Sequence, residues 1–103
     1  QQLGGTLQLA RRKSAGIAAR VLRTAPLTIR VRRGSEALRL GAGARQRTVR
    51  NLLQEAALPP WIRDRLPFIY IGGELAAIPG LGVDVRFQTA RNESGFLPVW
   101  RPD

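Results

Sequence analysis

The stretch from Gln46 to Asp84 constrains the fold more than any other part of the chain, because it reads as a helix, a proline corner and a hairpin in direct succession. Thr48 is a candidate helix N-cap, since its hydroxyl can accept a hydrogen bond from a free backbone N–H. The apolar residues behind it have the i, i+3, i+4, i+7 spacing of one buried helical face. They are Val49, Leu52, Leu53 and Ala56. The pattern predicts an amphipathic helix.

Prolines and glycines divide the second half of this stretch into elements. Pro59-Pro60 can end the first helix and begin a short second one, and Pro67 prevents the second helix from continuing. Two apolar runs, 68–71 and 75–78, then flank Gly72-Gly73-Glu74, where glycine accepts the positive φ of a tight turn. The sequence therefore predicts an antiparallel hairpin after the second helix.

Alternation of apolar and polar residues predicts strands in the rest of the chain. In 27–32, Leu27, Ile29 and Val31 are expected to face a core, and the polar residues between them face water or a ligand. Weaker patterns predict a return strand at 38–40, two strands at 6–9 and 17–22 around a polar turn at 11–14, and strands over 83–88 and 96–100. The predicted fold class is α+β: mostly antiparallel sheets in a small sandwich-like arrangement, one amphipathic helix and a short second helix.

The basic charge is concentrated in one half of the chain. Residues 1–50 hold twelve Lys or Arg and a single acid, Glu36, whereas residues 51–103 hold five basic and six acidic residues. Sixteen of the seventeen bases are arginine, whose planar guanidinium suits bidentate contacts with phosphate. Arginine that served only solubility would not need this segregation. A polyanionic partner is therefore predicted.

The sequence indicates no catalytic or metal site within this chain. It has no His and no Cys, so the commonest general base, nucleophile and metal ligands are missing. The seven carboxylates are scattered singly, without the spacing of a metal-binding loop. Asp64 lies between Arg63 and Arg65 and is expected to form structural ion pairs there. The paired glycines are interpreted as turns, because no phosphate-binding Lys-Ser/Thr follows them.

Length and composition indicate one small domain over residues 1–103. No run of 18 uncharged apolar residues is present, so no membrane partner is predicted. The absence of Cys allows a reducing compartment, and the cytoplasm is the expected location. The chain begins with Gln1 and contains no Met, so we expect it to be part of a longer reading frame.

The order of the motifs is also distinctive. A Thr/Val-basic-Asn-Leu-Leu-Gln helix precedes the run from Leu58 to Arg65, and Leu66-Pro67 then leads to a strand that ends in Pro79-Gly80-Leu81. This order resembles the C-terminal domain of bacterial tRNA(Ile)-lysidine synthetases. The likeness covers 25–88 best, with 1–24 as less certain strands and 89–103 as a C-terminal extension. Arg50 departs from the family pattern, which usually has Lys there, but the charge is kept.

The resemblance implies a division of labour between this domain and the rest of a longer enzyme. Members of the family use ATP to adenylate the wobble cytidine of an isoleucine tRNA with a CAU anticodon, and then attach lysine to it. Their ATP site is a Ser-Gly-Gly-Xaa-Asp-Ser loop, which this chain lacks. The resemblance therefore implies that ATP and the chemistry belong to an upstream catalytic domain of the same chain. No cofactor is expected here, and the domain is expected to bind the tRNA near its acceptor stem.

The expected RNA contacts are arginines on a rigid surface, because an A-form stem offers phosphates, 2′-hydroxyls and a shallow minor groove. The predicted contact residues lie on the helix face, just before it and along the first clear strand: Arg30, Arg32, Arg33, Arg45, Arg47 and Arg50. A solvated charged face is the alternative for the helix pair. Arg63 and Arg65 are interpreted as structural, and Trp61 as a core anchor in preference to a base-stacking residue.

Two further function classes stay open at this point. One is a basic RNA- or DNA-binding module of another kind, and the other is a protein-interaction domain whose charge serves solubility. The ordered motifs favour the tRNA-binding domain over both.

Overall fold

The predicted hairpin forms the centre of the fold. The computed structural model describes residues 4–32 and 34–102, and its central sheet is antiparallel with strand order β3-β6-β7-β8. Gly72 and Gly73 connect β6 to β7 with φ angles of 60° and 86°, as a tight hairpin turn with two positive φ angles requires. The four strands are β3 (Leu27–Arg30), β6 (Phe68–Ile71), β7 (Glu74–Ile78) and β8 (Gly82–Val83).

The middle strands β6 and β7 are covered on both faces, which explains why the runs 68–71 and 75–78 are apolar without interruption. Ile69 and Ile71 of β6 belong to one hydrophobic cluster, whereas Phe68 and Tyr70 face a second cluster on the opposite side. A β-bulge shifts the register between β6 and β7, so that Ile69 pairs with Ala77 while Tyr70 pairs with Leu75. The alternation of β6 therefore divides the core in two.

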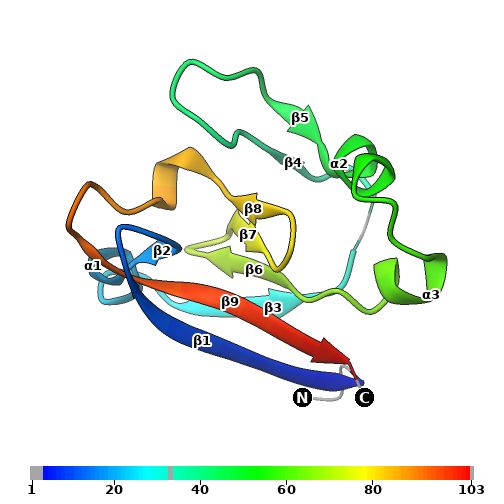
Figure 1. Cartoon of the computed structure of the whole chain (residues 1–103), viewed down its shortest axis with the longest axis horizontal. Coiled ribbons are helices and arrows are strands. Elements are labelled where there is room, and N and C mark those ends of the chain that lie inside the picture. The colour runs from blue at the N-terminus through cyan, green and yellow to red at the C-terminus, as the bar shows by residue number, and fades with distance from the viewer. Residues whose placement is uncertain (1–3, 33, 103) are drawn as a thin grey trace.

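The first outer layer joins the two ends of the chain (Figure 1). It is a three-stranded antiparallel sheet with the order β1-β9-β2, and β9 pairs with β1 from Gly5↔Pro102 to Lys13↔Ser94. A short helix, α1 (Ala19–Leu22), follows β2 directly. The strands are β1 (Gly5–Lys13), β2 (Ile17–Ala18) and β9 (Ser94–Pro102).

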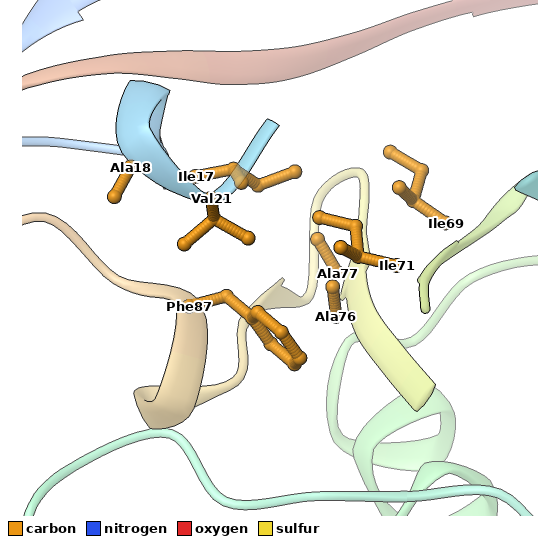
Figure 2. Close-up of a cluster of buried hydrophobic side chains, with 8 residues drawn as sticks. All are labelled: Ile17, Ala18, Val21, Ile69, Ile71, Ala76, Ala77 and Phe87. Atoms are coloured by element: carbon orange, nitrogen blue, oxygen red, sulfur yellow. The ribbon is translucent and has the colours of Figure 1, made fainter. Parts of the chain in front are cut away.

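Figure 2 shows the first hydrophobic cluster, in which side chains from this outer sheet and α1 point toward side chains of the central sheet. Its residues are Ile17, Ala18, Val21, Ile69, Ile71, Ala76, Ala77 and Phe87. Ile17 and Ala18 are completely buried although β2 has only two residues. Burial of this short strand therefore attaches the outer layer to the core.

The second outer layer contains helices α2 and α3 and lies on the other face of the central sheet (Figure 1). The two-stranded sheet of β4 and β5 leads directly into α2, and α3 follows. Thr48 caps α2 as predicted: its Oγ1 accepts a hydrogen bond from Asn51 N at 3.2 Å. These elements are β4 (Ala37–Leu38), β5 (Arg47–Thr48), α2 (Val49–Glu55) and α3 (Pro60–Arg63).

The predicted amphipathic face of α2 is confirmed for three residues and wrong for one. Val49, Leu52 and Leu53 are buried in the second cluster, beside Leu38 and Leu66 of the neighbouring segments. Ala56 is exposed, because α2 ends at Glu55 and Ala56 is already its C-cap. The helix therefore ends one residue before the last position of the predicted apolar face.

Two predictions for the N-terminal strands were wrong. The predicted polar turn at 11–14 is mostly strand, because β1 continues to Lys13, and only Ser14 has a positive φ, of 63°. The predicted strand over 17–22 is two residues of β2 followed by α1. Both errors have one cause: β1 and β2 pair with β9, some 80 residues later, and not with each other.

Three strands predicted from alternation also differ in the structure. Val31 is 53% exposed because β3 ends at Arg30, opposite Phe68, and Pro67 before Phe68 has no N–H to continue the ladder. Residues 38–40 do not return along β3, since Leu38 pairs with Arg47 of β5. The segment after β8 is the 3-10 turn η1 (Val85–Phe87). The last strand was predicted correctly, and β9 contains all of 96–100.

The fold class was predicted correctly as α+β with mostly antiparallel sheets, and every strand pair among the described residues is antiparallel. Helix α1 is an addition to the two predicted helices.

Candidate nucleic-acid interface

Three of the predicted arginines lie around the β4–β5 hairpin and α2. Arg45 is exposed in the loop that joins β4 to β5, and this loop projects from the end of the hairpin remote from α2 (Figure 1). Arg50 is exposed on the first turn of α2. Within the described part of the chain, neither side chain forms an ion pair. Both guanidinium groups are therefore available to an external anion.

Arg47 differs from Arg45 and Arg50, because it forms an ion pair with Glu55 at the end of α2. Arg47 Nη1 donates to Glu55 Oε1 at 2.9 Å, and Arg47 Nη2 donates to Glu55 Oε2. The bidentate hydrogen bond from Arg47 keeps the pKa of Glu55 below its ordinary value. The pair is neutral overall, so Arg47 adds no net positive charge to this surface while the pair is closed. Exposed ion pairs of this kind are weak enough to exchange partners.

The other predicted arginines lie beside the central sheet and α3. Arg30 projects from β3, and its guanidinium carbon is 5.1 Å from the centroid of the Tyr70 ring, within range of a cation–π contact. Arg32 is half-buried and lines a hollow together with Val31, Gly34 and Asp64. Arg33 lies outside the described residues. Of the predicted arginines that the structure describes, Arg30 and Arg32 thus lie on β3 and just after it, and the other three lie around the β4–β5 hairpin and α2.

The predicted ion-pair cluster around Asp64 does not form. In residues 4–32 and 34–102, Asp64 takes part in no salt bridge. Arg63 instead donates through Nε to the backbone oxygen of Leu58 at 2.7 Å, which closes the start of α3. Consecutive residues at a helix end point in different directions, so adjacency in sequence did not bring the charges together.

Trp61 is not the core anchor that the sequence suggested, since 70% of it is exposed. Because α3 is a single turn, Ile62 and the following Leu66 face inward and Trp61 faces out. The other tryptophan, Trp100, occupies the inner position: it packs against the second cluster and lines a groove together with Leu58, Ile62 and Leu66.

A buried carboxylate that the sequence analysis missed organises the hollow next to the β4–β5 hairpin. Asp84 is 3% exposed, and its carboxylate accepts hydrogen bonds from Arg39 N (3.0 Å), Arg86 N (3.0 Å) and Arg86 Nε (2.9 Å). Arg86 also bridges to Glu74. Burial alone raises the pKa of Asp84, but the hydrogen bonds from Arg86 and Arg39 outweigh it, and the pKa is lowered.

The Asp84 network is structural in character, because its hydrogen bonds and the Arg86–Glu74 ion pair connect three segments of the chain. Arg39 belongs to the loop after β4, whereas Glu74 begins β7. No signal in the sequence set Asp84 apart, since it alternates with Val83 and Val85 as an outward-facing strand residue would. Asp84 also accounts for the start of η1, because its carboxylate accepts a hydrogen bond from Arg86 N and so caps this turn.

The described residues contain no group of three or more side chains that could bind a metal ion. Nor does any helix found in them have the length and apolar character needed to cross a membrane.

Comparison with known protein families assigns the chain. The family model described as TilS substrate C-terminal domain matches residues 27–100, which include all of the central sheet, both helices of the second outer layer and most of β9. The chain belongs to the TilS C-terminal domain family. This agrees with the resemblance carried by the motifs between Gln46 and Asp84.

Curated relatives extend the likeness beyond the family model. The tRNA(Ile)-lysidine synthase of Nitrosomonas europaea is 33% identical over 102 residues, or 99% of this chain and 22% of that protein. The enzyme of the same name from Chromobacterium violaceum is 41% identical over 96% of this chain and 21% of its own length. The Azoarcus sp. (strain BH72) enzyme is 48% identical over 65 residues, 63% of this chain and 14% of that protein. This TilS C-terminal domain thus spans about a fifth of such relatives.

A solved structure titled "Crystal structure of TILS C-terminal domain" has the same fold. The two chains superpose with a TM-score of 0.71 over 98% of this chain and 86% of that chain, at 22% sequence identity. At this level of identity the comparison shows the fold, including the arrangement of its antiparallel sheets.

Proposed function

We propose that this TilS C-terminal domain binds tRNA, on the acceptor-stem side, for an ATP-dependent tRNA(Ile)-lysidine synthase. The enzyme would convert the wobble cytidine of the CAU anticodon to lysidine, with ATP and the chemistry in an upstream catalytic domain of the same chain. The observation that carries this proposal is the exposure of Arg45 and Arg50, which form no salt bridge within the described ranges, on a domain whose first 50 residues have a net charge of +11.

The chemistry of an RNA stem supports this reading of the surface. Its phosphates attract guanidinium groups without regard to sequence, and each phosphate that is neutralised releases counterions. Arg45 lies on the exposed loop of the β4–β5 hairpin, and Arg50 lies on a helix that is capped by Thr48 and anchored by Leu53. A charge on a fixed element such as this helix loses little freedom when it binds, so a rigid backbone of phosphates suits it.

The salt dependence of tRNA binding tests the proposal. The wild-type domain should bind an isoleucine tRNA with a CAU anticodon. Arg45→Ala/Arg50→Ala should lower the magnitude of the slope of log K against log salt by about 1.4 to 1.8, because each lost phosphate contact contributes about 0.7 to 0.9. Filter binding or fluorescence anisotropy at a series of salt concentrations measures this slope.

The matched control is Arg91→Ala/Arg101→Ala, which removes two exposed charges from the half of the chain with no net positive charge. Arg86 is unsuitable as a control because it holds Asp84. Equal losses in both double variants would reject the β4–β5 hairpin and α2 as the contact surface. Equal affinity for tRNA and duplex DNA would favour a general nucleic-acid module, and no complex with either at low salt would favour a protein-interaction domain.

A further inference from the structure

Trp61 is the most exposed of the large apolar side chains in the described residues. Its exposed fraction is 70%, whereas that of Val31 is 53% and those of Leu9 and Leu97 are 36% and 37%. Val31 lines the hollow that also contains Asp64, the C-cap of α3. One short helix therefore carries the most exposed apolar side chain, and the C-cap of that helix borders a hollow lined by the second most exposed one.

The backbone beneath Trp61 is held in place before any ligand arrives. The chain reverses at Pro59, whose carbonyl oxygen accepts hydrogen bonds from Ile62 N (3.0 Å) and Arg63 N (3.1 Å). Arg63 Nε adds its bond to Leu58 O, and Leu66 is buried below the helix. An indole on such a support has only two side-chain torsions to fix, so little conformational entropy is lost when it forms a contact.

The charges near Trp61 are those that a nucleic acid requires. Arg65 is exposed at the end of the α3 segment, and its side chain lies against Gly4, where an ideal Cβ would be 3.7 Å from Arg65 Cδ. Arg32 lines the hollow beside Asp64, so it adjoins the same helix. Among the described residues, neither Arg65 nor Arg32 is engaged in a salt bridge. An exposed indole on a segment that carries one such guanidinium group and adjoins another suits a base flanked by phosphates.

We propose that Trp61 stacks on an unpaired base next to an RNA stem, with Arg65 and Arg32 contacting the phosphates on either side of that base. This inference rests on the proposed tRNA-binding function and adds to it a site for single-stranded nucleotides. The face of Trp61 reads no sequence, because every base offers a π-surface. The site therefore distinguishes RNA with an unpaired end from RNA whose stem is fully closed.

Two RNA probes and two variants of the 103-residue chain test the site. The probes are a hairpin with four unpaired 3′ nucleotides and the same hairpin with a blunt end. Trp61→Ala should weaken binding of the first probe about tenfold and that of the blunt probe less than twofold, while Trp61→Phe retains part of the preference. Intrinsic fluorescence should be quenched by the first probe in the wild type and not in Trp61→Phe, where only Trp100 remains.

Leu97→Ala is the matched control, because Leu97 is another exposed large apolar residue but lies on β9. It should bind both probes as the wild type does. Equal losses for both probes, or no loss, in Trp61→Ala would overturn the stacking site and leave the proposed function intact. Concentration-dependent dimers that disappear in Trp61→Ala, with RNA binding unchanged, would assign Trp61 to a protein contact. Failure of the wild type to bind either probe at low salt would overturn the proposed function as well.

Discussion

At the scale of single residues, Asp84 shows how one buried carboxylate joins distant segments. Its oxygens accept from backbone and side-chain donors of Arg39 and Arg86, 45 and 2 residues away in sequence. The pKa of Asp84 is lowered because the hydrogen bonds from these donors outweigh its burial. Loss of the charge would leave buried N–H groups facing a neutral partner, and unsatisfied buried donors are costly.

The pH dependence of stability should carry the signature of Asp84. Its pKa is lower in the folded state, so the stabilisation is fully present above the ordinary carboxyl value and is lost as the pH falls through the folded pKa. We expect Asp84→Asn to lower the free energy of unfolding at pH 7 by about 1 to 3 kcal/mol and to flatten its decline below pH 4. Urea melts between pH 7 and pH 2.5 measure both effects.

The exposed carboxylate Asp64 provides the comparison for this experiment. Asp64→Asn removes a charge that is in no salt bridge among the described residues, so its melts should follow the wild type within about 0.5 kcal/mol. If the free energy of unfolding of Asp84→Asn depended on pH as that of the wild type does, the Asp84 carboxylate would contribute nothing to acid unfolding.

At the scale of elements, α2 shows that a helix can be placed well by its sequence and still end in a strained residue. The helix begins at the Thr48 cap and buries Leu52 and Leu53, as its periodicity predicts. It ends at Glu55 with Ala56 as its C-cap, and the next residue, Ala57, has a φ of 55°. Glycine is the usual residue at this position, because a Cβ is unfavourable in the left-handed region.

Ala57→Gly should therefore stabilise the domain, by about 0.5 to 1 kcal/mol, because relief of the left-handed strain exceeds the added entropy of the unfolded chain. Thermal or urea melts measure the change. Ala56→Gly is the control: Ala56 has a φ of −73°, so its replacement relieves no strain and should leave stability unchanged or lower it. Destabilisation by Ala57→Gly would contradict the assigned helix end.

At the scale of the whole molecule, the central sheet contributes side chains to both hydrophobic clusters, one on each of its faces. Ile17 of β2 lies in the cluster on one face, and Leu53 of α2 lies in the cluster on the other. Both side chains are nearly or fully inaccessible, at 0% and 1% exposed. Because the two clusters cover opposite faces of the sheet, loss of either cluster would expose the central strands.

We therefore expect one cooperative unfolding transition to which both clusters contribute. Ile17→Ala and Leu53→Ala should each lower the free energy of unfolding by about 2 to 5 kcal/mol. In a Trp61→Phe background, Trp100 fluorescence reports on the second cluster and far-UV circular dichroism on the whole chain. The two signals should move together in both variants. If Ile17→Ala shifted circular dichroism but not fluorescence, the two outer layers would unfold separately.

Local rules were sufficient for the part of the sequence in which neighbours along the chain are also neighbours in space. The hairpin at Gly72-Gly73, the α2 cap at Thr48 and the start of α3 at Pro60 each depend on turn chemistry or periodicity within a few residues. The ordered motifs likewise indicated the family to which the chain belongs. The polyanionic partner indicated by the segregation of arginine stays a prediction. These features need no knowledge of a distant partner.

Tertiary structure decided the features that depend on distant partners. Whether β1 continues through Lys13 depends on β9, and whether Trp61 is buried depends on which side of α3 meets the core. The same holds for charged groups. Glu55 pairs with Arg47, and Asp84 accepts hydrogen bonds from Arg39 and Arg86, although no local sequence pattern predicted either arrangement. Burial and pairing are properties of the surroundings of a residue, and only the folded chain brings those surroundings together.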